Sequence, residues 1–147
     1  MKLQTDLREF IELLNSRRVE FVVVGGHAVA FHGNPRYTGD IDFLVGQDAR
    51  NSERLADVLR EFGFGEVAAD TFTAADRVIQ LGRPPNRIDL LTTISGVSFE
   101  EAWGSRVPAE LDGLPVTFLG RDALLKNKRA SGRPKDLADV DELERRG

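Results

Sequence analysis

The sequence predicts a mixed α/β (α+β) domain in which helices pack on one mixed central sheet. Three observations support this fold class: a length of 147 residues, ordinary shares of apolar (41%) and charged (30%) residues, and alternating helix and strand patterns without an internal repeat. Compact domains mostly have about 100 to 200 residues, so we expect a single domain over residues 1–147. Within it, residues 121–147 are expected to form a C-terminal helical extension.

The first half of the chain predicts three helices and two strands. An apolar stripe at helical spacing over 7–14, with Thr5 as its N-cap, indicates the first helix. The β-branched run at 21–24 predicts a buried strand, which is followed by a short helix over 28–31 and a second strand over 40–45. A third helix has its apolar stripe at 55–62, with Asn51 or Ser52 as the expected N-cap.

The second half predicts two hairpins and three helices. Strands at 77–81 and 87–91 flank a proline-containing turn, and an Asp-Gly pair at 112–113 joins a second pair of strands that ends at 116–119. Between the hairpins, Ser98 followed by Glu101 is a capping-box signature for a short helix through 103. Helices over 121–130 and 135–144 are expected at the end.

Composition excludes several kinds of site and partner. There is no cysteine, so disulfides, thiolate zinc sites and cysteine nucleophiles are excluded. A net charge of −4 argues against a general nucleic-acid coat protein, although a local basic patch stays open. Because there is neither an apolar signal core nor an apolar run of the roughly 20 residues that span a bilayer, we expect a cytoplasmic protein without a membrane partner.

Two adjacent glycines follow the predicted strand at 21–24. Gly25 and Gly26 stand directly before a short helix, where a ligand can approach the backbone closely. Free N–H groups and the positive dipole end at a helix N-terminus favour phosphate. A glycine pair at such a turn is more often structural, so this feature alone does not establish a binding site.

Two aspartates share one face of the next predicted strand. Asp40 and Asp42 are two residues apart, so their Cα atoms lie about 6.5 to 7 Å from each other. Neighbouring carboxylates repel unless a cation lies between them, and paired divalent ions promote in-line attack at phosphorus. A solvated strand face is the usual explanation, but apolar flanks indicate an inner strand. Asp89, on the strand at 87–91, could complete a metal site or act as a general base.

These residues together resemble the DNA polymerase β-type nucleotidyltransferase superfamily. The shared pattern is a glycine pair, a short helix and an Asp-x-Asp strand, with a third carboxylate on a later strand. The longer string over 25–42 is similar to small stand-alone bacterial nucleotidyltransferase-like proteins related to the AbiEii toxins. The basic residues and the Lys-Asp pair over 126–136 resemble the tail of these proteins, so the resemblance covers residues 21 to about 143.

The resemblance implies a nucleotidyltransferase fold and a metal-dependent transfer of a nucleoside monophosphate from an NTP to an acceptor hydroxyl. It implies that Asp40, Asp42 and Asp89 are catalytic and bind Mg²⁺ (or Mn²⁺). The implied nucleotide-binding residues are Gly25, Gly26, Arg36, Thr38, Lys126 and Arg129. The acceptor stays open between RNA or tRNA, a protein and a small molecule, and an antitoxin or another partner protein is a further expectation.

Two other interpretations stay open. Gly26 stands where many active superfamily members have serine, and the chain offers little room for an acceptor domain. The protein could therefore be a catalytically inactive module that binds a nucleotide or a partner. It could also be a protein-interaction domain in which the acidic residues only keep the chain soluble. Similarly, the basic segment over 126–135 has two interpretations: a solvated helix end or a contact to triphosphate or RNA.

Overall fold

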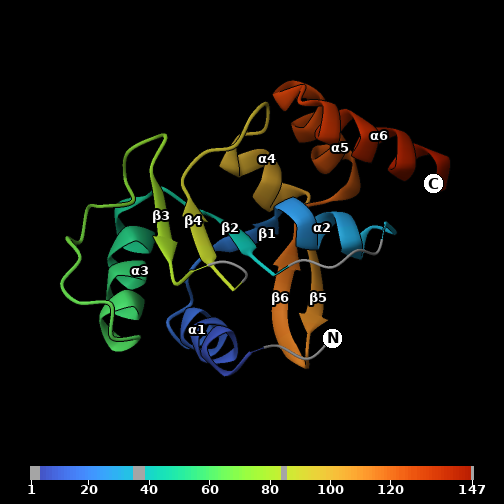
Figure 1. The fold of residues 1–147 in the computed structure, drawn as a ribbon. Coiled ribbons are helices and arrows are strands. Elements are labelled where there is room, and N and C mark those ends of the chain that lie inside the picture. The colour runs from blue at the N-terminus through green and yellow to red at the C-terminus, as the bar shows by residue number, and fades with distance from the viewer. Residues whose placement is uncertain (1–3, 35–38, 84–85, 147) are drawn as a thin grey trace.

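A computed structural model describes residues 4–34, 39–83 and 86–146, which form one mixed sheet and the helices packed on it (Figure 1). The elements, in chain order, are α1 (Thr5–Ser16), β1 (Phe21–Val24), α2 (Gly25–Phe31), β2 (Ile41–Val45), α3 (Ala49–Glu61), β3 (Val78–Leu81), β4 (Ile88–Leu91), α4 (Phe99–Gly104), β5 (Val107–Leu111), β6 (Leu114–Phe118), α5 (Arg121–Ser131) and α6 (Pro134–Arg146). The predicted fold class and the predicted order of elements are confirmed.

The six-stranded sheet has the order β3-β4-β2-β1-β6-β5. Strand β2 pairs antiparallel with β1 and parallel with β4, while β1 pairs parallel with β6. The two predicted hairpins, β3–β4 and β5–β6, form the two antiparallel edges of the sheet. This order places β2, which carries Asp42, next to β4, which carries Asp89.

The core lies mainly between the sheet and the α1–α3 pair. Phe10 of α1 contacts Phe43 of β2 and Phe62, which follows α3, with ring centroids 5.9 and 5.2 Å apart. Helix α2 packs on β1 and β2, while α4, α5 and α6 gather on one side of the molecule (Figure 1). Among the described helices, none covers the outward face of β3 and β4, opposite α3 (Figure 1).

The structure corrects two predicted helix caps. Helix α1 begins at Thr5 with Gln4 as its N-cap, and Asp48, not Asn51 or Ser52, caps α3 by accepting a hydrogen bond from the Asn51 backbone N–H. The side chain of Asn51 is buried and donates to the carbonyls of Glu20 and Gly46, so its polar groups stabilise a loop instead of the helix end. None of the described helices is long and apolar enough to cross a membrane.

Candidate active site

The sheet register brings two of the predicted carboxylates side by side. Asp42 of β2 pairs with Asp89 of β4, and on the other side of β2 it pairs with Val24, the last residue of β1. Asp40 lies just before β2, where its Oδ1 accepts a hydrogen bond of 2.9 Å from the backbone N–H of Arg87. The three aspartates therefore meet where β2 and β4 begin.

Gly25 lies directly against the Asp42 carboxylate, in a space that only a residue without a side chain can occupy. Its φ is +69°, and a Cβ built there would lie 2.2 Å from Oδ2 of Asp42. Any other residue would be strained in this conformation and would displace the carboxylate. The predicted glycine turn thus brings the start of α2 directly against Asp42, and Gly26 follows in the first turn of that helix.

Burial and neighbouring charge keep Asp42 partly protonated. Burial, as the largest cause, together with a hydrogen bond with Asp89 and the charges of Asp89 and Asp40, raises its pKa to about 7. The positive charge of Arg87 opposes this shift. Three aspartates thus meet a single arginine, and the site carries more acidic than basic groups.

Arg87 is the site residue that the sequence analysis did not identify. Its Nε donates to Oδ1 of Asp89 at 2.7 Å and its Nη2 donates to Oδ2 at 3.1 Å, a two-pronged contact. Its Nη2 also lies 3.5 Å from Oδ2 of Asp40. These ion pairs and the hydrogen bond to Asp89 raise the pKa of Arg87, which stays charged. Arg87 therefore orients Asp89 and neutralises part of the charge.

A pocket of about 390 Å³ opens beside the aspartates, and helices α5 and α6 form its far wall. Its lining residues are Val24, Gly25, Asp42, Leu91, Ile94, Ser95, Asn127, Lys128, Ser131, Arg133 and Asp136. The carboxylate of Asp42 faces this space from the sheet. The pocket thus joins the glycine turn, one acid and the C-terminal helices into one site.

The far wall contains a buried ion cluster that the sequence analysis also missed. Lys128 Nζ lies 3.0 Å from Asp136 and 3.1 Å from Asp139, and all three side chains are buried. Burial alone would raise the pKa of Asp136, but hydrogen bonds from Ser131, Arg133 and Lys128 outweigh burial and hold that pKa well below its usual range. The cluster fixes α6 against α5 at the edge of the pocket.

The remaining predicted residues are not gathered at this pocket. Lys126 pairs with Glu101 at 2.7 Å, and Arg129 pairs with Glu144 at 2.7 Å. Neither Lys126 nor Arg129 lines the pocket, whose α5 side consists of Asn127, Lys128 and Ser131. Arg36 and Thr38 lie outside the described residues. The phosphate contacts expected of these four residues stay predictions.

The three aspartates offer the hard oxygen ligands that Mg²⁺ and Mn²⁺ prefer. Asp42 and Asp89 are paired on neighbouring strands and Asp42 lines the pocket, so a divalent ion bound there would meet carboxylate oxygens. Among the described residues, no group of three His, Asp or Glu side chains is already arranged around one metal position. Arg87 donates to both oxygens of Asp89, so the donor set fits a metal once Arg87 yields one of them.

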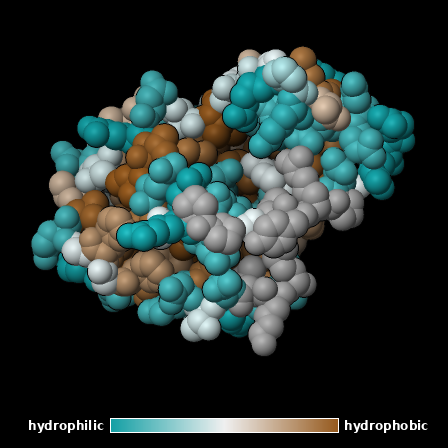
Figure 2. Space-filling model, in the orientation of Figure 1, coloured by the Kyte–Doolittle hydropathy of each residue, from teal (hydrophilic) through white to brown (hydrophobic). Residues whose placement is uncertain are grey.

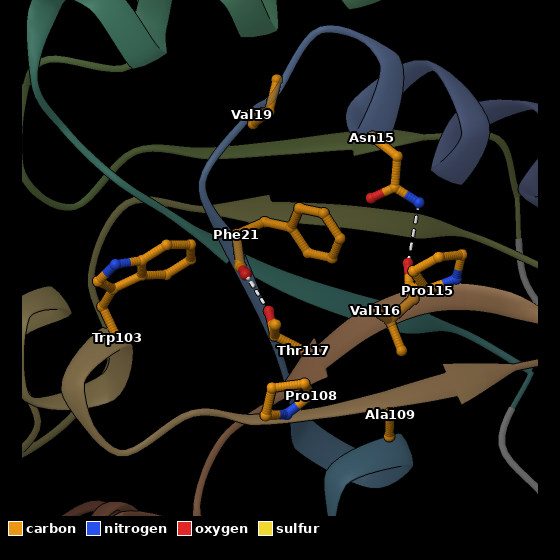
Figure 3. A pocket seen from close by; sticks show the side chains of 9 residues that line it. All are labelled: Asn15, Val19, Phe21, Trp103, Pro108, Ala109, Pro115, Val116 and Thr117. Carbon is orange, nitrogen blue, oxygen red and sulfur yellow. Dashed lines mark hydrogen bonds between the residues drawn. The ribbon is translucent and has the colours of Figure 1, made fainter.

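A second pocket, of about 240 Å³, has a different character (Figure 3). It lies between α1, β1, α4 and the β5–β6 hairpin, and its lining residues are Asn15, Val19, Phe21, Trp103, Pro108, Ala109, Pro115, Val116 and Thr117. Its Asn15 and Thr117 side chains already donate to the carbonyls of Pro115 and Phe21. It shares no residue with the carboxylate pocket and contains no ionisable group.

The site joins a glycine turn to an Asp-x-Asp strand, with a third aspartate on the parallel neighbouring strand. The chain belongs to the family DUF6036, described as nucleotidyltransferases of unknown function, whose profile matches residues 2–144. No curated protein matches the chain.

Two solved structures are similar to this fold. One is a protein from Thermotoga maritima that is assigned as a nucleotidyltransferase, with a TM-score of 0.59 and 14% identity over 96% of this chain and 91% of that one. The other is an antigenic nucleotidyltransferase-like protein from Paracoccidioides brasiliensis, with a TM-score of 0.56 and 18% identity over 94% of this chain and 74% of that one. At these identities the likeness extends to the fold alone.

Proposed function

We propose that this protein is a metal-dependent nucleotidyltransferase that transfers a nucleoside monophosphate from an NTP to an acceptor hydroxyl and releases pyrophosphate. The observation that carries the proposal is the pairing of Asp42 with Asp89 across β2 and β4, with Asp40 beside them, at a pocket bordered by Gly25. Membership of a nucleotidyltransferase family supports it.

Asp40, Asp42 and Asp89 would hold Mg²⁺ or Mn²⁺. Such ions polarise the phosphoryl oxygens and orient the attacking and leaving groups. The protein's own part is positional: because Gly25 has no side chain, the Asp42 carboxylate can lie directly against the start of α2, at the edge of the pocket where the phosphates would bind. Asp89, which Arg87 orients, would accept the proton of the acceptor hydroxyl once one of its oxygens leaves Arg87.

Cations complete the proposed site. Arg133 lines the pocket and has a largely exposed side chain, so it can reach a bound phosphate while Lys128 stays buried. Lys126 and Arg129 are proposed as outer contacts, which reach a triphosphate only after they leave Glu101 and Glu144. Exposed ion pairs of this kind are weak, so an exchange of partners costs little.

The relation to the AbiEii toxins and a role in a toxin–antitoxin pair belong to this proposal as its finer part. The tail motif over 126–136 supports it, because this segment builds the pocket's far wall in the structure. A growth assay on induced expression tests it: arrest by wild type and normal growth with Asp42→Asn is expected, and equal growth with both contradicts a toxic activity.

An inactive nucleotide-binding module is the second candidate. The contact of Arg87 with both oxygens of Asp89 favours it, because this contact competes directly with a metal ion. Retained binding of Mg-NTP, seen as a rise in melting temperature, without a labelled product on any acceptor would establish this second function.

The test of the main proposal is a labelling experiment. Purified protein is incubated with Mg²⁺, each α-labelled NTP and a mixture of total RNA and cell lysate. Wild type should move label onto a macromolecule, and Asp42→Asn should not. The matched control is Asp122→Asn, which removes the same charge from a fully exposed side chain on α5 and should keep full activity. An active Asp42→Asn variant would overturn the proposal.

A further inference from the structure

Two neighbouring pockets at one end of the sheet have Trp103 as a common lining residue. One is the apolar pocket of about 240 Å³ in Figure 3, and the other, here called the acidic pocket, has a volume of about 480 Å³. We propose that the two pockets together form a docking groove for an extended segment of a partner polypeptide. An aliphatic side chain of that segment would occupy the apolar pocket, and a lysine or arginine side chain would occupy the acidic pocket.

Both pockets lie at the end of the sheet where β1 begins. Val19 and Phe21 line the apolar pocket, while Glu20, which stands between them in the sequence, lines the acidic pocket. Successive side chains of an extended chain point to opposite sides, so the two pockets flank the chain at the start of β1. Alternate side chains of an extended peptide lie about 7 Å apart on one side, so a bound segment can place one in each pocket.

Trp103 is a fixed divider between the two pockets. Its ring stacks on the ring of Phe99 with centroids 5.7 Å apart, and the guanidinium of Arg106 lies 3.8 Å from its centroid. Arg106 also donates to the Trp103 carbonyl at 2.6 Å, and it lines neither pocket. Phe99 lies in turn against Gly46, where a Cβ would be only 3.1 Å from its ring. The groove is therefore preformed, which lowers the entropic cost of binding.

The acidic pocket has a charge that selects its occupant. Glu20, Asp48 and Glu100 bring carboxyl groups to it, and no basic side chain is among the described residues that line it. The stacked rings of Phe99 and Trp103 form an aromatic part of the same wall. Carboxylates accept charge-assisted hydrogen bonds, and aromatic faces attract cations. The pocket thus fits an ammonium or guanidinium group.

The apolar pocket fits an aliphatic side chain. Its lining contains no ionisable group among the described residues. The side chains of Asn15 and Thr117 already donate to the carbonyls of Pro115 and Phe21, as Figure 3 shows. An apolar side chain would therefore enter without leaving these two donors unsatisfied, and its removal from water would stabilise the complex.

Charge distinguishes this groove from other exposed apolar surface. Figure 2 shows hydrophobic surface over β3, where Val78 is 56% exposed, but nothing at Val78 indicates the chemistry of a partner. At the groove, three carboxyl groups would repel the phosphates of a nucleic acid, and a small amine would leave the apolar pocket unused. A polypeptide segment that carries both kinds of side chain uses the whole groove.

The groove adjoins the carboxylate pocket. Ile94 lines both the acidic pocket and the carboxylate pocket, so a docked segment would lie next to the proposed active site. Docking itself involves neither the metal nor the nucleotide. Its test is therefore independent of the proposed function.

The experiment measures binding of a fluorescein-labelled peptide, Gly-Leu-Thr-Arg-Thr-Gly-amide, by anisotropy without metal or NTP. In parallel, the unlabelled acetylated peptide is titrated while the emission of Trp103, the single tryptophan of the chain, reports on the groove. The test variant is Glu20→Gln/Glu100→Gln. The control, Glu53→Gln/Glu66→Gln, makes the same change in net charge at exposed positions that line neither pocket.

Wild type should bind the peptide saturably, with a change in Trp103 emission, and the control should match it. The test variant should bind about tenfold more weakly, and so should wild type with a peptide that has Gln in place of Arg. These two losses should not add, because each removes the same contact. Ala109→Leu reduces the space in the apolar pocket, so it should weaken the original peptide about tenfold but not a peptide with Gly in place of Leu.

Several results would overturn the inference. No saturable binding by wild type, additive losses from the two Gln substitutions, or binding that leaves Trp103 emission unchanged would each refute the groove. Spermidine binding as tight as that of the peptide, with no effect of the Leu-to-Gly change, would indicate a small amine instead of a polypeptide. A concentration-dependent dimer in sedimentation that Glu20→Gln/Glu100→Gln dissociates would identify a second copy of this chain as the occupant.

Discussion

The two walls of the carboxylate pocket differ in how their charges are balanced. On the helical wall, Lys128 lies 3.0 and 3.1 Å from two acids, and Asp136 also pairs with Arg133 at 2.7 Å. On the sheet wall, Asp42 and Asp89 face each other, and the pKa of Asp42 rises to about 7 through burial and the neighbouring acids. The helical wall is compensated, whereas the sheet wall keeps unbalanced negative charge.

This difference indicates that the helical wall has a structural role and the sheet wall a functional one. Groups that are buried with all partners present mainly hold elements together, while strongly perturbed acids in a cleft are typical of functional sites and reduce stability. We therefore expect substitutions on the helical wall to unfold the protein, and substitutions at Asp42 to stabilise it while activity is lost.

The largest effect is expected from Lys128→Met, which leaves Asp136 and Asp139 buried without their shared cation. Removing one partner of a buried ion cluster costs about 3 to 5 kcal/mol of unfolding free energy. The control is Lys126→Met on the same helix, whose exposed pair with Glu101 is worth about 0 to 1 kcal/mol. Urea unfolding measures both, and equal losses would contradict the contrast between a structural and an exposed cation.

Gly25→Ala should have the next largest effect, at the point where the sheet wall meets α2. A residue with a side chain is strained at this positive φ, and the new Cβ would collide with Oδ2 of Asp42. We expect a loss of about 2 to 3 kcal/mol. Gly63→Ala is the control, because its φ is also positive (+90°) but no atom lies within 4 Å, so only backbone strain of about 1 kcal/mol is expected. Similar losses in both variants would show that the contact with Asp42 does not matter.

The sequence predicted the elements well because their signals are local. Helical spacing, β-branched runs and turn residues identified each helix and strand, and the Asp112-Gly113 turn identified the β5–β6 hairpin. The order of the sheet depends on contacts between distant segments, such as β4 beside β2, and no local pattern predicts these. The predicted cap of α3 was wrong because tertiary contacts decided where Asn51 directs its side chain.

For the site, the alternation of side chains on a strand predicted that Asp40 and Asp42 share a face. It did not predict which basic side chains contact the acids of the site. Arg87 could have been found, because it stands two residues before Asp89 and therefore on the same face. Lys128 has a weaker signal: it follows the buried Leu124 and Leu125 at helical spacing, which indicates a buried lysine and hence a buried acid. Its partners became visible only once α6 was placed against α5.

On the sheet wall, Asp42→Asn should increase the free energy of unfolding, whereas the two preceding substitutions decrease it. The folded pKa of about 7 exceeds the ordinary 3.8, so between these values the folded protein binds more protons than the unfolded chain, and stability falls as pH rises. Asparagine does not ionise, so the variant should lack this loss and be more stable than wild type above pH 7, by about 1 kcal/mol. Urea unfolding at pH 5 and pH 8, without divalent metal, measures this. Parallel pH profiles for wild type and variant would contradict it, and Asp122→Asn should follow wild type.

The smallest effect is expected from Lys126→Ala/Arg129→Ala, which removes the two exposed cations of α5. Both side chains are about half exposed in their ion pairs, so the loss of unfolding free energy should stay below about 1 kcal/mol. As outer phosphate contacts, they should raise the KM for NTP about threefold and leave kcat unchanged, because an interaction equal in the ground and transition states affects binding alone. An unchanged KM would show that neither residue contacts the nucleotide. A large fall in kcat would instead place both beside the reacting phosphate, with the aspartates of the sheet wall.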